Sequence, residues 1–286
     1  MSTRSLRRTP WPRTCSPPPP PPTGYSTTTP PAAAADVELP FGDAAGAAAW
    51  LDDHTAQILA AARDAAAAGD HQRALDLAGT LDTRLPRGPH AARAVEAADL
   101  ALAAARHTGP AAAVVERTLV LSDAHRRGED HERARAVAEA ALAEAEHQAL
   151  AAELTGRAAY YVGMCSAYSG DHQGALAAYE RAAGLGEGAG DLGLAAAAEG
   201  GVAWSLAKVG RAAEALDPAR RALTLAEAAG GKSQIAAAYD TLGQAHAAAG
   251  DPAAALASYK AALAIYERID YQARVAQVRD SIAALP

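Results

Sequence analysis

The stretch YDTLGQAHAAAGDPAAALASYKAAL, residues 239–263, decides the fold. It indicates a helix, a short Gly-Asp turn and a second helix, with a small residue, Gly243, in the first helix and an aromatic residue, Tyr259, in the second. The stretch GMCSAYSGDHQGALAAYERA, residues 163–182, has the same order. Small residues such as Gly243 and Ala255 let two helices approach closely, so the pattern predicts helical hairpins. We expect Tyr259 to fill the gap to the next hairpin.

Matching Ala positions recur along the chain at a nearly fixed spacing. Successive positions are 40, 41, 40 and 40 residues apart, at Ala94-Val95, Ala134-Arg135, Ala175-Leu176, Ala215-Leu216 and Ala255-Leu256. The unit around Ala134 is expected to contain a one-residue insertion at 128–130. A fixed period of this size indicates stacked units, none of which can bury its hydrophobic face alone. The sequence therefore predicts an all-α fold, a right-handed α-solenoid of about five hairpins and about 12 helices.

The order of small residue, turn glycine, alanine and aromatic residue resembles the tetratricopeptide repeat (TPR). The usual TPR period is 34 residues, so a period of 40 implies longer helices or longer turns between repeats. The third full unit departs from the pattern, with Ala203 for the glycine, Ala219 for the aromatic residue and Pro218 inside its second helix. Because proline removes a backbone hydrogen bond, we expect this helix to be kinked.

The N-terminal part of the chain differs from the rest in composition. Residues 1–38 are predicted to be a disordered Pro-, Thr- and Ala-rich tail, because Pro17 to Pro22 form an unbroken proline run that cannot build a core. Residues 39–286 are predicted to be the repeat domain.

Two parts of the repeat domain lie outside the regular period. At its start, a long helix at about 44–68 is expected to pack before residues 71–84, which act as the first helix of a hairpin with a helix at 89–106. The last segment, 271–285, is amphipathic and is expected to cap the open end of the stack.

The entry into the repeats has a second resemblance. Leu39-Pro40-Phe41 and the following run with Trp50-Leu51 and Ile58 resemble the junction into the C-terminal repeat arm of AfsR/SARP-type regulators. These actinobacterial transcription activators place such repeats after a DNA-binding domain and an NB-ARC ATPase. The resemblance implies a regulatory or sensing arm. The 38 residues before it cannot hold the other two modules, so none of their DNA or nucleotide chemistry transfers to this chain.

Charge and cysteine content exclude several classes of function. The net charge is −7, and Arg4, Arg7, Arg8 and Arg13 leave the remainder more acidic still. Such a body disfavours nonspecific binding to nucleic acids or anionic membranes. The two cysteines form no CxxC motif, which favours a cytoplasmic location. No 18-residue stretch is apolar and uncharged enough to predict a membrane span.

Three patterns suggest chemistry, but each has a simpler interpretation. Ala226 and Gly231-Lys232-Ser233 fit a permissive phosphate-loop pattern, yet they follow a predicted helix rather than a strand, so a capping turn is favoured. His125, Glu129, Asp130 and His131 are metal-ligand types on a predicted turn, without the spacing of a known metal motif. Cys165 is expected to be a packed residue rather than a nucleophile. The chain is therefore predicted to be no enzyme and to need no cofactor.

A binding groove is the remaining candidate site. In TPR proteins the first helix of each hairpin lines the concave surface, and we expect residues three before, one after and five after the small residue to face it. Those positions are Tyr160, Met164, Tyr168, Gly200, Trp204, Lys208, Asp240, Gln244 and Ala248. The preceding unit, aligned by Gly128, adds Thr118, Ser122, His125 and Arg126. Tyr160, Met164, Tyr168 and Trp204 would form an aromatic patch suited to protein contacts, or would instead pack in the core. No basic cradle is expected, because Lys208 and Arg126 stand alone.

The predicted function is a protein–protein interaction scaffold with a regulatory or sensing role. Its ligand would be a protein or peptide that binds in the groove. An NB-ARC ATPase or regulator is one such partner. Binding to nucleic acid or to a membrane is not expected. The groove residues that contact this ligand would be Tyr160, Met164, Tyr168, Trp204, Lys208, Asp240 and Gln244. One alternative is a regulator related to quorum-sensing receptors that responds to a short signalling peptide. Another is a nucleotide-dependent switch or enzyme that uses the turn at Lys232.

Overall fold

The computed structural model of the chain describes residues 43–81 and 91–286. The predicted tail and Leu39-Pro40-Phe41 lie outside the described residues. Within the described part every regular element is a helix, which confirms the all-α prediction and the expected number of helices. The helices are α1 (Ala44–Ala67), α2 (His71–Gly79), α3 (Ala91–Thr108), α4 (Ala111–Arg127), α5 (His131–His147), α6 (Ala152–Tyr168), α7 (His172–Ala189), α8 (Leu192–Lys208), α9 (Ala212–Ala229), α10 (Lys232–Ala248), α11 (Pro252–Arg268) and α12 (Gln272–Ala283).

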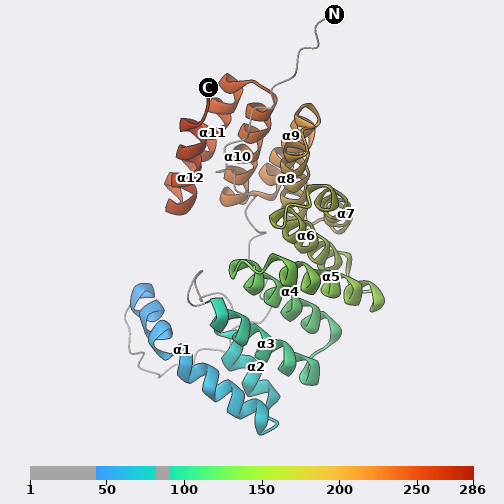
Figure 1. Cartoon of the computed structure of the whole chain (residues 1–286), viewed down its shortest axis with the longest axis vertical. Helices are drawn as coiled ribbons and strands as arrows, with labels where there is room; N and C mark the ends of the chain where they lie inside the picture. Colours follow the sequence, from blue (N-terminus) through green and yellow to red (C-terminus); the bar gives the residue numbers. More distant parts are fainter. Residues whose placement is uncertain (1–42, 82–90) are drawn as a thin grey trace, which may run out of the picture. The chain divides into compact units, whose positions relative to one another are not determined.

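Two compact units share these helices. The first unit ends at Leu194 and the second comprises Ala195–Pro286, so the boundary falls in the first turn of α8. In the first unit the hairpins are α1–α2, α4–α5 and α6–α7, and α3 packs against both α2 and α4. The second unit has the hairpins α8–α9 and α10–α11, followed by the single helix α12 (Figure 1). Four of these hairpins are predicted by the sequence, whereas α1–α2 stands in place of the expected pairing of 71–84 with 89–106.

The long period comes from long helices. Each helix from α4 to α11 has 17 or 18 residues. The connections between them are only two to four residues long. Of the two explanations for a period near 40, longer helices are therefore the correct one, and longer turns are not.

The turn inside each hairpin has a recurring geometry. At the α6–α7 turn, Gly170 adopts φ 87°, which favours glycine, and the Asp171 carboxylate accepts a hydrogen bond from the backbone N–H of Gly174 at 2.8 Å. The α1–α2 turn has the same features, with Gly69 at φ 80° and Asp70 as the cap. The turn before α2 is thus of the kind that precedes the second helix of a hairpin. The prediction that residues 71–84 form the first helix of a hairpin is wrong in this respect.

The α4–α5 turn is as long as the others. Glu129 occupies the left-handed position with φ 63°, and Asp130 caps α5 as Asp171 caps α7. The predicted insertion at 128–130 is therefore wrong. The extra residue lies in the connection between α5 and α6, which has four residues where the next two such connections have two.

Two hairpins, α6–α7 and α10–α11, are closed by a tyrosine that lies on a glycine. A Cβ added at Gly163 would lie 2.8 Å from the Tyr179 ring, and one at Gly243 would lie 2.6 Å from the Tyr259 ring. Tyr259 therefore packs on its own hairpin, and it also belongs to a core cluster with Val275 of α12. The expectation that it only fills the gap to the next element is thus incomplete.

The hairpin α8–α9 closes without these residues. Ala203 and Ala219 are both buried there, so two small side chains replace the glycine–tyrosine contact. Helix α9 continues unbroken past Pro218. The predicted C-terminal segment is helical as α12, and its Val275 and Val278 are buried against α11.

Candidate binding surface on the first helices of the hairpins

We use the name inner face for one side of the first helix of a hairpin. Its positions are counted from a small residue that stands nine positions before the first residue of the second helix. These residues are Ser122, Gly163, Ala203 and Gly243. Ser122 takes this place in α4, because its hydroxyl donates to the Ala134 carbonyl of α5 at 2.8 Å, where the two helices are closest. The inner face comprises the positions three before, one after and five after each small residue.

The alignment of α4 through Gly128 is therefore wrong. It selected Thr118, Ser122, His125 and Arg126, whereas the inner-face positions of α4 are Leu119, Asp123 and Arg127. The signal that could have found them is the capping residue Asp130, which is equivalent to Asp171 and fixes the register.

Asp123 organises a charged cluster on α4. One carboxylate oxygen accepts a hydrogen bond from Arg126 at 2.5 Å, and the other forms an ion pair with Arg127 at 2.5 Å. Arg126 is only 5% exposed. Burial acts to lower the pKa of this guanidinium, but the attraction of Asp123 outweighs burial and the pKa is raised. Arg126 is therefore held charged inside the first unit.

Helix α6 adds aromatic and basic groups to this cluster. The guanidinium of Arg126 lies 5.1 Å from the centroid of the Tyr168 ring, within the range of a cation–π interaction. Arg157 of α6 pairs with Glu116 of α4 at 3.5 Å. Three arginines thus lie on adjoining faces of α4 and α6, and the expectation that Arg126 stands alone is wrong. We call Asp123, Arg126, Arg127, Arg157 and Tyr168 the arginine–tyrosine cluster.

The predicted residues of α6 differ in their accessibility. Tyr160 and Met164 are buried, and the Tyr160 ring centroid lies 5.4 Å from that of Tyr179 in α7. This placement fits the alternative in which large residues pack in the core. Tyr168 is half-buried, so part of its side chain remains exposed.

In the second unit, the inner face of α8 carries a tryptophan and a lysine. The Lys208 ammonium lies 5.3 Å from the centroid of the Trp204 ring, again a cation–π geometry. Trp204 is buried and Lys208 is half-buried. The two predicted residues of α8 are thus neighbours one turn apart.

The inner face of α10 carries a buried polar pair. The Gln244 amide donates to the Asp240 carboxylate at 3.3 Å, and the two residues are 6% and 4% exposed. Burial raises the pKa of the Asp240 carboxyl, although the positive charge of Arg274 and the hydrogen bond from Gln244 act in the opposite direction. The Gln244 side-chain oxygen is buried and has no hydrogen-bond partner.

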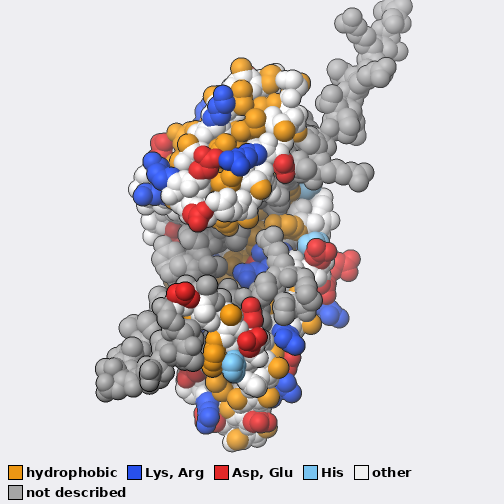
Figure 2. Space-filling model, turned by 90° about the vertical axis from the view of Figure 1, so that its left-hand side faces the viewer, with side chains coloured by type: hydrophobic (Ala, Val, Ile, Leu, Met, Phe, Trp, Pro, Cys, Tyr) orange, Lys and Arg blue, Asp and Glu red, His pale blue; other side chains and the backbone are white. Residues whose placement is uncertain are grey.

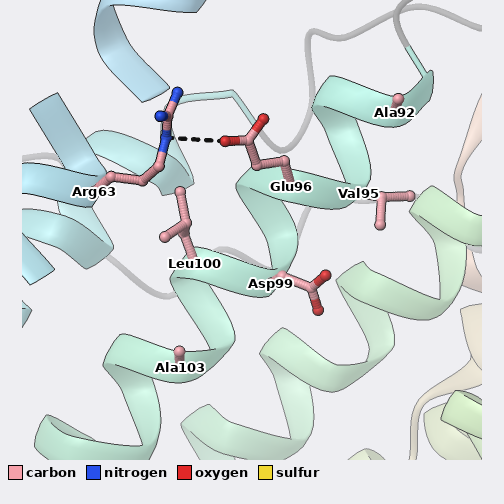
Figure 3. A pocket seen from close by; sticks show the side chains of 7 residues that line it. All are labelled: Arg63, Ala92, Val95, Glu96, Asp99, Leu100 and Ala103. Atoms are coloured by element: carbon pink, nitrogen blue, oxygen red, sulfur yellow. Dashed lines mark ion pairs between the residues drawn. The ribbon is translucent and has the colours of Figure 1, made fainter. Parts of the chain in front are cut away.

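An open pocket of about 490 Å³ lies on the first unit between α1 and α3 (Figure 3). An ion pair of 3.0 Å joins Arg63 of α1 to Glu96 of α3 at its rim. Val95 and Leu100 supply apolar side chains to it. The sequence pattern does not predict this pocket, although Arg63 stands eight residues before α2 and so occupies an inner-face position.

The patterns that suggested chemistry have structural explanations. Lys232 is the first residue of α10 and follows helix α9, so the phosphate-loop match lies on a turn between two helices, as expected. Asp130 caps α5, and the His131 ring stacks on Tyr168. In the described residues no three His, Cys, Asp or Glu side chains come together as a metal site. The Cys165 thiol is buried beside Ser122, and burial raises its pKa to about 11.

The surface of the described residues is chemically mixed. Figure 2 shows acidic and basic side chains interspersed with hydrophobic ones on the face turned to the viewer. Tyr271 and Val209 are the large hydrophobic residues with the greatest exposure in the described part, and they are isolated from each other in sequence. None of the described helices is both long and apolar enough to cross a membrane.

Comparisons with known proteins agree with the helical-repeat fold. Residues 194–268 match the tetratricopeptide repeat family. The match covers the hairpins α8–α9 and α10–α11, where the inner face carries Trp204, Lys208, Asp240 and Gln244. No curated protein matches the chain in a sequence comparison.

Solved structures of similar fold include several repeat proteins. BtubC (BKLC) from P. vanneervenii is 22% identical, with a TM-score of 0.55, over 68% of this chain and 80% of BtubC. A Podosopora anserina protein described as a kinesin light chain with TPR-like repeats is 15% identical, with a TM-score of 0.54, over 69% of this chain and 94% of that one. A Rap protein complexed with competence and sporulation factor is 14% identical, with a TM-score of 0.50, over 75% of this chain and 64% of that one. At these identities the likeness shows the fold alone, a TPR-like solenoid.

Proposed function

We propose that this chain is a protein-interaction scaffold that holds a peptide segment of a partner on the inner face of its first helices. It acts through binding, without a catalytic step of its own, in the cytoplasm. The observation that carries the proposal is the arginine–tyrosine cluster on α4 and α6. Tyrosine and arginine are the residue types that most often carry the binding energy of protein interfaces.

The arginine–tyrosine cluster combines rigid support with accessible groups. The Arg127 and Arg157 side chains are 24% and 22% exposed, and each is held by a carboxylate of α4. Tyr168 is positioned by Arg126 on one side and by His131 on another. Side chains that are already ordered lose less conformational entropy when a ligand binds. The cluster is therefore suited to hold a partner without a large rearrangement.

The groove residues predicted from the sequence keep their place in the proposal, with different roles. Tyr168 and Lys208 are half-buried and would meet the ligand. Tyr160, Met164, Trp204, Asp240 and Gln244 are buried and would support the face from behind.

A regulatory role is the finer part of the proposal. It rests on the resemblance of the entry segment to AfsR/SARP-type regulators, in which repeats follow an NB-ARC ATPase. In that setting the inner face would hold an ATPase or regulator until an effector binds. The holding of an ATPase or regulator rests on analogy with that family alone.

A peptide-responsive regulator is the second candidate. The fold is similar to that of a Rap protein which was solved in complex with competence and sporulation factor. In this case the ligand would be a short free peptide rather than a segment of a partner protein. Thermal stabilisation of the full chain by peptides from the producing culture would favour this candidate, because a ligand stabilises the folded state that it binds.

The proposal is tested by selection of random decapeptides on the immobilised full chain. We expect the selection to yield peptides that bind the chain. For a peptide that binds the first unit, Tyr168→Ala should lower the affinity by about tenfold or more, as expected for a residue at the centre of an interface. Fluorescence anisotropy measures the affinity, and circular dichroism checks the helical content.

The control is Tyr271→Ala, which removes a more exposed tyrosine from the turn before α12. It should leave the affinity unchanged. A selection that yields no binder, or equal losses in both variants, would show that the inner face of α6 is not the binding surface.

A further inference from the structure

Helix α3 leaves one of its sides open to the pocket that it forms with Arg63 of α1. The helix lies between the hairpins α1–α2 and α4–α5 and packs against α2 and α4. Its pocket residues recur at intervals of three and four positions, which places them on one face of the helix. They are Ala92, Val95, Glu96, Asp99, Leu100 and Ala103. At 1.5 Å per residue this face is roughly 16 Å long, the length of about five residues of an extended peptide.

The apolar part of the pocket rests on the core of the first unit. Val95 and Leu100 are half-buried and pack against the core cluster that contains Leu59 and Leu102. Ala103 is small and exposed, so it leaves room above the helix. The volume of about 490 Å³ lies within the range of ligand-binding sites. The pocket is therefore large enough for one large apolar side chain of a partner.

The charged residues of the pocket do not balance. Arg63 and Glu96 neutralise each other through their ion pair of 3.0 Å. Asp99 adds a second carboxylate, which is exposed and forms no ion pair with another described residue. In Figure 3 the Asp99 side chain points away from Arg63, so its carboxylate is not shared with that pair. One positive and two negative charges give the lining a net charge of −1, which favours a basic group on the ligand.

We propose that this pocket binds one large apolar side chain of the partner segment over Val95 and Leu100, with a lysine or arginine of the same segment at Asp99. The inference rests on the proposed function, and it gives the scaffold a second contact with a ligand chemistry opposite in charge to that of the arginine–tyrosine cluster. The alkyl stem of a lysine or arginine can lie along apolar surface while its charged end reaches a carboxylate. The two ligand residues can therefore be neighbours in the segment.

The apolar contact should contribute more to the affinity than the charge does. Burial of a large apolar side chain raises an affinity by about tenfold or more. A pair of exposed charges changes it by only about two- to fivefold, and salt weakens that effect. The two contributions can thus be measured separately.

The apolar contact is tested with the decapeptides selected on the full chain. Ala103→Trp fills the pocket from an exposed position of α3, so peptides that use the pocket should lose about tenfold or more in affinity. The matched control is Ala140→Trp, which adds the same side chain at an exposed position of α5 in the same unit and should leave the affinity unchanged. If Ala103→Trp lowers the helical content, Ala92→Trp at the other end of the same face takes its place.

The charge is tested with the peptides that Ala103→Trp weakens. Each is made again with glutamine in place of its basic residue. Wild-type protein should bind the basic peptide about two- to fivefold more tightly at low salt, and the preference should shrink at high salt. Asp99→Asn should bind both peptides equally. Asp64→Asn removes the same charge from an exposed position of α1 that does not line the pocket, and it should keep the preference.

The outcomes separate this proposal from the scaffold proposal. If peptides lose affinity in Tyr168→Ala but none loses it in Ala103→Trp, the pocket proposal is overturned and the scaffold proposal stands. Equal losses in Ala103→Trp and Ala140→Trp, or a preference that survives Asp99→Asn, would also overturn the pocket proposal alone. A selection that yields no binder would overturn both.

Discussion

The buried carboxylate of Asp240 gives a pH dependence with a definite sign. Burial raises its pKa in the folded protein above the value of 3.8 in the unfolded chain. The folded state therefore holds this proton more tightly, and its stability falls as the pH rises through the folded pKa. Asp240→Asn cannot ionise and should escape this loss.

We therefore expect Asp240→Asn to be more stable than wild type at pH 7 and to lose this advantage below pH 3.8. Urea unfolding at several pH values measures the difference. An Asp240→Asn variant that is less stable than wild type at pH 7 would mean that the carboxylate has a stabilising partner.

The Cys165 thiol should be inert in the folded chain. Its pKa of about 11 leaves roughly one thiol in a thousand ionised at pH 8, and the side chain is buried. With Cys15 replaced by serine, Ellman's reagent should react with Cys165 only as the protein unfolds in urea. Rapid reaction of the native protein would contradict the packing of α4 against α6 around this residue.

Individual site residues were only partly predictable from the sequence. Asp240 and Gln244 follow from the register of a single helix, and their contact with a ligand stays a prediction. The ion pairs of Asp123 depend on the register of α4, which was misassigned because Glu129 occupies a position that glycine has elsewhere. Burial of Tyr160 depends on the packing of α6 against α7, and no local pattern encodes it.

Helix packing gives the clearest stability prediction. Gly163→Ala would place a Cβ 2.8 Å from the Tyr179 ring, so the ring or the helix must move. Such overpacking costs about 1–3 kcal/mol. The control is Gly184→Ala on α7, where a Cβ meets no atom within 4 Å. The control should stabilise the protein by up to about 1 kcal/mol, because alanine is the better helix former.

Chemical denaturation measures both glycine variants. Equal effects of Gly163→Ala and Gly184→Ala would show that α6 and α7 do not meet at the glycine–tyrosine contact.

The hairpins themselves were predictable because their signals are local. Gly-Asp turns, alanine at the crossings and a 40-residue period together fix the order of the helices and their approximate ends. The role of α2 was misassigned because the step from Ala74 to Ala94 is half a period, although the turn at Gly69 and Asp70 carries the same signal as the later turns. Local turn chemistry was the better guide than spacing.

The division of the chain into two compact units cannot be recognised from the repeat pattern. The boundary at Leu194 lies within the first turn of α8, and the spacing of 40 residues continues across it. A division of this kind depends on how many contacts cross the boundary, which no local motif records. Each unit nevertheless has its own polar group on the inner face, the arginine–tyrosine cluster in one and Asp240 with Gln244 in the other.

Hydrogen–deuterium exchange of the full chain with a selected decapeptide tests the central claim most directly. The account predicts that bound peptide slows exchange in first helices, in α4 and α6 or in α8 and α10, and leaves α5, α7, α9 and α11 unchanged. Slower exchange confined to the second helices of the hairpins would contradict it.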